Sequence, residues 1–236
     1  MGSKIAITLS VVGLAFIALF LWSYSGTIAS ITVDEKVVAL SYDDGPNPPH
    51  TRAMLKALDK HGVKATFFLK GRNAEAFPDA VREIAAAGHE IGNHSYYHRA
   101  MTTASQDDML EEVLRTNQIL KNILGFEPVL FRPPYGAQGP GLKLALDALE
   151  MKSILMNAHG TDWEETDPAL IASAILTSID PGSIVLLHDG HGDVDDPLSQ
   201  DSRAATVVAT EIIIESLQAQ GYRIVPVGEL LALGNQ

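Results

Sequence analysis

The pattern of apolar and polar positions divides the chain into an apolar N-terminal run and a longer alternating part. The run from Ile5 to Trp22 holds eighteen residues without a charge. As a helix it measures about 27 Å, close to the roughly 30 Å hydrocarbon core of a bilayer. Lys4 precedes the run, whereas Asp34 and Glu35 follow it, so we expect a single-pass membrane protein with a cytoplasmic N-terminus and the remainder outside the cytoplasm. The alternative is a cleaved signal peptide and a secreted product, but the run is longer than a signal h-region and its exit matches an A-x-A site poorly.

From Lys36 onward, short apolar runs alternate with amphipathic stretches, which predicts alternating strands and helices. The strand candidates are continuous apolar runs, as in sheets that are buried on both faces. Glycines stand where four of the helices should end, namely Gly62, Gly88, Gly125 and Gly221. The predicted strands are 37–42, 65–69, 89–92, 128–131, 153–157, 183–187 and 223–227. The clearest predicted helices are 51–60, 73–87, 106–124, 168–179 and 204–220.

This succession of strands and helices indicates an α/β domain. About seven strand–helix units without a linker-like break predict one parallel barrel or wound sheet. We therefore divide the chain into residues 1–30, a membrane anchor with its linker, and residues 31–236, a single domain.

Polar residues follow five of the predicted strands directly. In a parallel barrel or sheet the carboxyl ends of the strands share one face, and catalytic groups collect there. The convergence of five loops on that face therefore predicts an active site. The polar groups are Asp43-Asp44, His94 with His98, Arg132 to Gly136, Asp162-Trp163 and His188-Asp189.

Composition narrows the chemistry of that site. The chain has 17 basic and 29 acidic residues and a net charge of −12, which argues against a nucleic-acid partner. It also has no cysteine, which excludes disulfides, cysteine zinc sites and thiol nucleophiles. A metal site in this protein must therefore use histidine and carboxylate ligands.

Two of the polar groups have the residue types of a metal site. His94 and His98 are spaced i and i+4, so a helix would present both imidazoles to one ion, although two surface histidines have the same spacing. Asp43 and Asp44 end a buried strand, where adjacent carboxylates repel one another unless a cation lies between them. An Asx-type turn before the following Gly-Pro is the alternative. One aspartate as a ligand and the other as a base would remove the conflict.

Two further residues are candidates for catalysis. Arg132 precedes two prolines at a strand end, where it is either a surface arginine on a rigid loop or a group that orients a carboxylate and keeps it ionised. His188 directly follows an apolar strand, a position more often taken by a structural core histidine. Its place beside four other polar loops favours catalysis.

Together these motifs resemble the polysaccharide deacetylase family, also called NodB-homology or carbohydrate esterase family 4 domains. The resemblance covers roughly residues 36 to 232. It implies an α/β fold, a distorted (β/α) barrel with about seven parallel strands, preceded here by one N-terminal transmembrane helix. The motifs are Tyr42-Asp43-Asp44-Gly45-Pro46, His94-x-x-x-His98, Arg132-Pro133-Pro134-Tyr135-Gly136, Asp162-Trp163 and Leu186-x-His188.

The resemblance also implies a metal site and an acetyl pocket. Asp44, His94 and His98 would bind one divalent ion, most often zinc, with cobalt, nickel or manganese as alternatives. Trp163 and Leu186 would line the pocket for the acetyl group.

Four catalytic roles are implied in the same way. Asp43 would be the base and Arg132 the residue that positions it. The Tyr135 backbone N–H would help to stabilise the oxyanion, and His188 would be the catalytic acid.

The chain departs from the family at one position. The fourth motif usually has an aspartate four residues before its tryptophan, and this chain has His159 there. An imidazole cannot raise the pKa of His188 as a carboxylate would. We therefore expect His188 to lose its proton at lower pH than in relatives with the aspartate, unless Asp162 or Asp189 substitutes. The remaining histidines, expected in caps, loops or solvated surface, are His50, His61, His89 and His191.

The sequence thus predicts a membrane-anchored, metal-dependent deacetylase that removes N-acetyl groups from N-acetylglucosamine units of an extracytoplasmic glycan, chitin-like or peptidoglycan. One alternative is an O-acetyl esterase or small-amide hydrolase on the same metal centre, and another is a catalytically inactive glycan-binding domain. The expected partners are an acetylated glycan and, through the N-terminal helix, the membrane. The sequence leaves the oligomeric state open.

Overall fold

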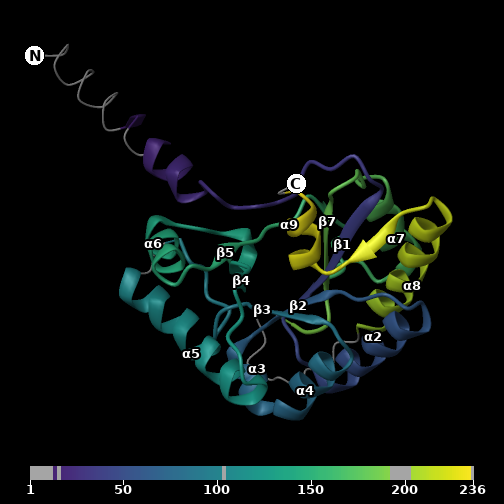
Figure 1. Cartoon of the computed structure of the whole chain (residues 1–236), viewed down its shortest axis with the longest axis horizontal. Helices are drawn as coiled ribbons and strands as arrows, with labels where there is room; N and C mark the ends of the chain where they lie inside the picture. The colour runs from purple at the N-terminus through teal and green to yellow at the C-terminus, as the bar shows by residue number, and fades with distance from the viewer. Residues whose placement is uncertain (1–12, 15–16, 103–104, 192–202, 235–236) are drawn as a thin grey trace, which may run out of the picture.

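A parallel β-sheet forms the centre of the computed structural model, which describes residues 13–14, 17–102, 105–191 and 203–234 (Figure 1). Seven strands follow the order β5-β4-β3-β2-β1-β7-β6, and an eighth, β8, pairs with β1. Every pairing between these strands is parallel. The strands are β1 Val37–Asp43, β2 Thr66–Leu69, β3 Glu90–Asn93, β4 Leu130–Phe131, β5 Lys152–Ser153, β6 Ala158–His159, β7 Ile184–His188 and β8 Arg223–Val225.

Helices surround the sheet, with α5 and α6 on one side of Figure 1 and α2, α7 and α8 on the other. Local sequence explains several of their ends. Ser105 caps α5 by accepting from Asp108 N, and Gly125 ends that helix with φ 85°, a conformation that glycine adopts readily. The helices are α2 Pro48–Lys60, α3 Gly71–Ala76, α4 Pro78–Ala86, α5 Gln106–Leu124, α6 Pro140–Ala148, α7 Pro168–Leu176, α8 Ala204–Ala219 and α9 Val227–Leu233, with a 3-10 turn, η1, at Pro134–Gly136.

The predicted parallel sheet with alternating helices is confirmed, with differences in detail. All seven predicted strands are present, and the structure adds the two-residue strand β6. Pro78 divides the helix predicted at 73–87 into α3 and α4, because proline favours the first turn of a helix and breaks its interior. The helices α6 and α9, of 9 and 7 residues, were not predicted. Both begin without a side-chain cap, whereas the equally short α7 begins at Asp167, whose side chain accepts from Ala169 N.

The sheet is a half-barrel whose two end strands, β5 and β6, are not paired with one another in the described chain. Residues 28–31 bridge the opening. Ile28 N donates to Ser153 O at 2.9 Å, Leu155 N donates to Ile28 O at 2.7 Å, and Ile31 N donates to Gly182 O at 3.0 Å. The barrel is therefore distorted, as the family resemblance implies, and the N-terminal segment lies along its gap.

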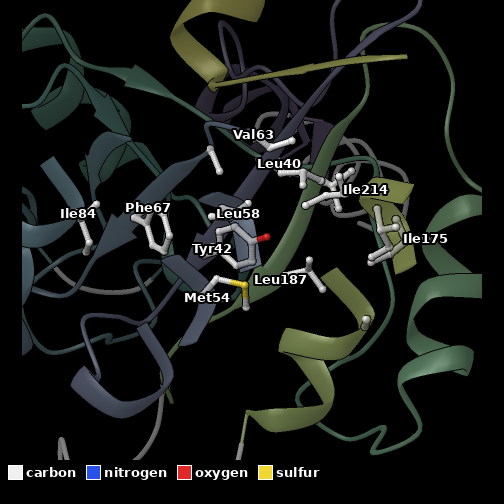
Figure 2. Packing of buried hydrophobic residues seen from close by; sticks show 14 of the residues in the cluster. Leu40, Tyr42, Met54, Leu58, Val63, Phe67, Ile84, Ile175, Leu187 and Ile214 are labelled. Carbon is white, nitrogen blue, oxygen red and sulfur yellow. The ribbon is translucent and has the colours of Figure 1, made fainter. Parts of the chain in front are cut away.

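The alternation of β1 decides which side chains face the site. Val38, Leu40 and Tyr42 pack into the cluster between sheet and helices, part of which Figure 2 shows. Val37 and Ala39 belong to a second cluster on the other face. Because strand side chains alternate between faces, Ser41 and Asp43 continue the second set and point into the barrel.

His89 lies in the loop between α4 and β3, which is one of the positions expected for it. Its side chain is buried and not solvated, however, and its ring lies edge-on 5.3 Å from Phe67. Its Nδ1 accepts a hydrogen bond from Ala65 N at 3.1 Å. Burial, together with the charge of Lys64, lowers the pKa of His89 to about 4.

The predicted membrane span, residues 5–22, lies mostly outside the described residues. Within the part of the chain that the structure describes, no helix is long and apolar enough to cross a bilayer. Residues 17–23 are helical and project from the barrel (Figure 1). The anchor and the division at residue 30 stay predictions.

Candidate active site

A cavity of about 540 Å³ opens at the carboxyl ends of the strands. It collects every predicted site residue except Arg132, which lies buried beside it. The predicted residues that line it are Asp43, Asp44, His94, His98, Tyr135, Trp163, Leu186 and His188.

Asp44, His94 and His98 bring three ligand atoms together. His94 Nε2 and His98 Nε2 lie 3.6 and 3.3 Å from Asp44 Oδ1. Asp44 Oδ1 is buried and accepts no hydrogen bond from the described residues. Ligand atoms about 2.1 Å from a tetrahedral ion lie about 3.4 Å apart, so the spacing fits a divalent ion. Burial would raise the pKa of Asp44, but His98 and His94 lower it to about 2, which keeps the carboxylate ionised.

The loop that carries the two histidines is a turn, so the helical presentation considered from their spacing is wrong. Ser95 and His98 have φ of 61° and 60°. His98 N donates to Ser95 Oγ at 3.0 Å, and Ser95 N donates to Asn93 Oδ1 at 2.8 Å. His94 Nδ1 donates to Arg132 O at 2.7 Å. That bond leaves Nε2 of His94 as the ligand atom.

Arg132 and Asp43 form a buried ion pair. Arg132 NH1 donates to Asp43 Oδ1 at 2.7 Å and to Ser41 Oγ at 2.8 Å. NH2 and Nε donate to Leu155 O and Ile154 O at 3.3 and 3.4 Å. Burial lowers the pKa of Arg132, and Asp43 opposes that shift. The guanidinium therefore fixes one oxygen of Asp43 and leaves Oδ2 3.7 Å from His94 Nε2.

His188 pairs with Asp162, which corrects the expectation drawn from His159. His188 Nδ1 donates to Asp162 Oδ1 at 2.8 Å, and His188 N donates to Oδ2 at 2.9 Å. Burial would lower the pKa of His188, but the Asp162 carboxylate reverses the effect, and the pKa is raised. His159 instead lies beside Trp163, with 5.7 Å between ring centroids. Asp162 lies at the start of the turn 162–164 after β6, and its buried side chain occupies the place of the missing family aspartate beside His188.

Two residues that the sequence did not single out hold Asp162 in place. Thr206 Oγ1 donates to Asp162 Oδ2 at 3.1 Å, and Arg203 NH1 donates to Asp162 O at 2.8 Å. Arg203 is buried and lines the cavity. Both lie at the start of α8, where the amphipathic pattern gave no sign of a contact with the site. Ser41, by contrast, is a polar interruption of an apolar strand, a signal that was available.

The remaining predicted residues form the rim and wall of the cavity. Tyr135 has φ 58° within η1, and its ring lies 4.6 Å from that of His98. The Trp163 ring meets His188 edge-on at 5.4 Å. Both aromatic side chains are exposed, whereas Leu186 is buried in the wall. The cavity thus has one exposed aromatic ring beside His98 and another beside His188.

Asp189 supports the loop that carries Asp44. Thr51 Oγ1 donates to Asp189 Oδ2 at 2.5 Å. A Cβ on Gly45 would collide with this carboxylate, so the turn needs glycine there. Burial raises the pKa of Asp189 to about 7. Asp189 does not contact His188 as a charge partner, and that role belongs to Asp162.

Comparison with known proteins places these motifs in a family context. The family model described as polysaccharide deacetylase matches residues 30–154. A peptidoglycan-N-acetylglucosamine deacetylase of Bacillus cereus is 36% identical over 189 residues, which are 80% of this chain and 66% of the relative. A chitooligosaccharide deacetylase of Azorhizobium caulinodans is 31% identical over 208 residues, which are 86% of this chain and 99% of the relative.

A solved structure with the same fold is that of a CE4 (carbohydrate esterase family 4) pseudoenzyme from Bacillus anthracis. It is 29% identical, with a TM-score of 0.78, and the match covers 87% of this chain and 68% of that chain. The chain spans between 40% and 66% of the length of the first two curated relatives.

Proposed function

The chain belongs to the polysaccharide deacetylase family, and from that premise we propose that it is a metal-dependent hydrolase acting on N-acetylglucosamine units of an extracytoplasmic glycan. One observation carries the proposal: a single cavity is lined by the Asp44, His94 and His98 cluster, by Asp43 and by His188. The reaction is hydrolysis of the acetamide. A C–O bond forms between water and the acetyl carbon, the C–N bond breaks, and acetate and the amine leave.

Asp43 accepts the proton of the attacking water. Arg132 holds Asp43 Oδ1 at 2.7 Å, so the other carboxylate oxygen faces the ligand cluster and the water. Ser41 Oγ accepts a bond from the same guanidinium and so helps to orient Arg132 toward Asp43, the proposed base.

His188 gives a proton to the departing amine. Its Nδ1–H is bound to Asp162, so Nε2 is the nitrogen that carries the transferable proton. The same carboxylate raises the pKa of His188 and so keeps the imidazolium populated near neutral pH. The Tyr135 backbone N–H is the proposed donor to the oxyanion, a contact worth about 3 kcal/mol in comparable sites.

Asp44, His94 and His98 would hold the divalent ion. When bound there, such an ion polarises the acetyl carbonyl and lowers the pKa of a coordinated water. Two imidazoles and one carboxylate suit zinc, and they also accept cobalt, nickel or manganese. Three protein ligands leave positions open for water and substrate.

The aromatic rim supports a sugar substrate. Tyr135 and Trp163 expose their rings on the cavity, and Leu186 offers an apolar wall to the acetyl methyl. The names of the relatives point to peptidoglycan and to chitooligosaccharides, both of which contain N-acetylglucosamine.

Membrane anchoring through the N-terminal helix is part of the proposal. The uncharged run at 5–22 supports it, as do the exposed apolar side chains of Ile17, Phe20 and Leu21 in the described helical residues. Such side chains are stable in lipid. Extraction of the full chain from membranes by detergent but not by alkaline carbonate would support an anchor, and recovery of a shortened chain in the soluble fraction would contradict it.

Acetate release from a panel of acetylated glycans tests the activity. The full chain, loaded in turn with zinc, cobalt and nickel, should release acetate from chitooligosaccharides or peptidoglycan fragments and lose the activity on chelation. Asp43→Asn should abolish release while leaving metal binding intact. Asp167→Asn, at the exposed N-cap of α7, is the matched control and should remain active.

The alternatives give different results in the same assay. Release from O-acetylated glycans alone would favour an esterase. Metal binding without acetate release from any glycan would favour an inactive glycan-binding domain, and the proposed function would then be wrong.

A further inference from the structure

The N-terminal segment, residues 23–31, contacts the active-site loop 133–138 as well as the barrel opening. Tyr24 supplies the contact through its hydroxyl group. Gln138 N donates to Tyr24 OH at 3.0 Å, and Tyr24 OH donates to Gly136 O at 3.4 Å. One side chain from the membrane-proximal segment thus bonds to both ends of the turn that follows Tyr135.

Gln138 strengthens this connection from inside the protein. Its side chain is buried, its amide nitrogen donates to Ser23 O, and its amide oxygen accepts from Ser153 Oγ at 2.6 Å. Gln138 therefore links three parts of the chain that are distant in sequence: the N-terminal segment, the active-site loop and β5.

The loop needs such support because of its backbone. Tyr135 and the following Gly136 both have positive φ, 58° and 63°. A residue other than glycine pays about 1–3 kcal/mol for such a conformation and keeps it only where the surroundings enforce it. Two backbone bonds within the loop, Gly136 N to Pro133 O and Ala137 N to Pro134 O, both at 3.0 Å, hold the turn locally. The hydroxyl of Tyr24 is bonded directly to the same turn from outside the loop, so it helps to enforce this conformation.

The N-terminal segment also connects to Asp43, the proposed base, through Leu155 and Arg132. Ile28 O accepts from Leu155 N at 2.7 Å, and Leu155 O accepts from Arg132 NH2 at 3.3 Å. Arg132 in turn holds Asp43. Residues 23–31 thus contact the Tyr135 turn directly, and three successive contacts, Ile28 with Leu155, Leu155 with Arg132 and Arg132 with Asp43, connect them to the proposed base.

We propose that Tyr24 is a positioning residue for the active-site loop, so that the membrane-proximal segment is part of the catalytic unit and not a passive tether. The inference rests on the proposed function and deepens it. It also implies that a signal-peptidase cut on the C-terminal side of Tyr24 would remove a support of the active site.

The test is Tyr24→Phe in the full chain, which removes one oxygen and keeps the ring. We expect kcat per bound metal to fall about tenfold with little change in KM, because misplacement of a catalytic donor weakens the transition state more than substrate binding. Amide exchange in residues 133–139, followed by mass spectrometry, should become faster. Tyr222→Phe is the matched control. It removes the hydroxyl of a tyrosine on the far side of the barrel, and neither readout should change.

A second variant separates positioning from general destabilisation. Ser153→Ala removes the other support of Gln138, so its effect on kcat should be less than additive with that of Tyr24→Phe, since both act through one loop. Additive losses of kcat in the double variant would overturn the inference. A fall in total activity that is fully explained by an equal loss of bound metal would also overturn it. Unchanged kcat and exchange in Tyr24→Phe would also overturn it.

The exchange measurement keeps this inference distinct from the proposed function. If the wild-type chain released no acetate, the proposed function would fail, and exchange alone would decide whether Tyr24 holds the loop. Faster exchange in Tyr24→Phe would then support the contact, and unchanged exchange would overturn it.

Discussion

His188 Nδ1 lies 2.8 Å from Asp162 Oδ1, and the backbone N–H of His188 bonds the second oxygen of the same carboxylate at 2.9 Å. Two bonds from one residue fix both the orientation and the tautomer of the imidazole. Because the pair is buried, its charge interaction is only weakly screened. The proton that His188 holds on Nε2 is therefore controlled by Asp162.

Replacing Asp162 by asparagine should shift the pH dependence of the reaction. The acid works while it is protonated, so activity falls as pH rises through the pKa of His188. Asp162 raises this pKa. Once its carboxylate is removed, the burial of His188 acts to lower the same pKa. The alkaline limb of kcat/KM should therefore move to lower pH, and kcat at pH 8 should fall about 10- to 100-fold. A pH–rate profile of Asp162→Asn measures both.

His159→Asp is the matched comparison, because it restores the aspartate usual in the family at a position that does not contact His188. Its alkaline limb should coincide with that of the wild type. The opposite result, an alkaline limb that moves in His159→Asp and stays in place in Asp162→Asn, would contradict this account. It would show that the His188–Asp162 pair does not control the protonation of His188.

Removal of Arg132 should damage stability and activity together. Its side chain is fully buried and paired with Asp43, so Arg132→Met leaves an uncompensated carboxylate inside the barrel. The free energy of unfolding should fall by about 3–5 kcal/mol, which urea denaturation measures. Arg52→Met is the control, because its bidentate bond to Glu83 is exposed, and its urea midpoint should change little. Equal shifts in the two variants would contradict the account of the buried pair.

Metal binding should stabilise the protein through a single site. Zinc at about 100 times its dissociation constant should raise the free energy of unfolding by about 2.7 kcal/mol, seen as a higher melting temperature that chelation reverses. His94→Ala should lose this response.

His61→Ala should keep the response to zinc and is the control for a second group of metal-type ligands, His61, Glu211 and Glu215. Lys60 already pairs with Glu211 at 2.6 Å, which competes with an ion there. If the zinc response survived in His94→Ala and disappeared in His61→Ala, the ion would bind at His61, Glu211 and Glu215, and the proposed metal site in the cavity would be wrong.

His89 should make the metal-free protein less stable in acid. Burial lowers its pKa from 6.5 to about 4, so between these values the unfolded chain binds more protons than the folded one. Stability is therefore complete above about pH 6.5 and declines as pH falls toward 4, by at most about 3 kcal/mol from this group. Urea unfolding at pH 7, 5.5 and 4.5 should show a flatter decline in His89→Gln than in the wild type. An identical decline in both would assign the acid sensitivity to other groups.

Local sequence was sufficient for most of the fold. The helix over 106–124 was predicted with the bounds it has, because Ser105 and Gly125 are strong local signals at its two ends. Polar groups directly follow the apolar run of β1, and parallel strands bring their carboxyl ends to one face. For that reason the sequence could identify the residues of the metal cluster and those of the Asp43–Arg132 pair as candidates. The short elements β6, α6 and α9 were not predicted, and the two helices among them begin without a side-chain cap that would have marked their start.

Tertiary structure decided the contacts between residues that share no local pattern. The family resemblance directed attention to His159, but the turn after β6 brings Asp162 to His188. Arg203 and Thr206 reach Asp162 because the start of α8 lies beside that turn. The position of residues 23–31 is the clearest case. Nothing in their sequence indicates an active-site contact, because the contact exists only where the half-barrel is left open and its edges need hydrogen-bond partners. Sequence alone determined which chemical groups the protein carries, and the closure of the barrel determined which of them act together.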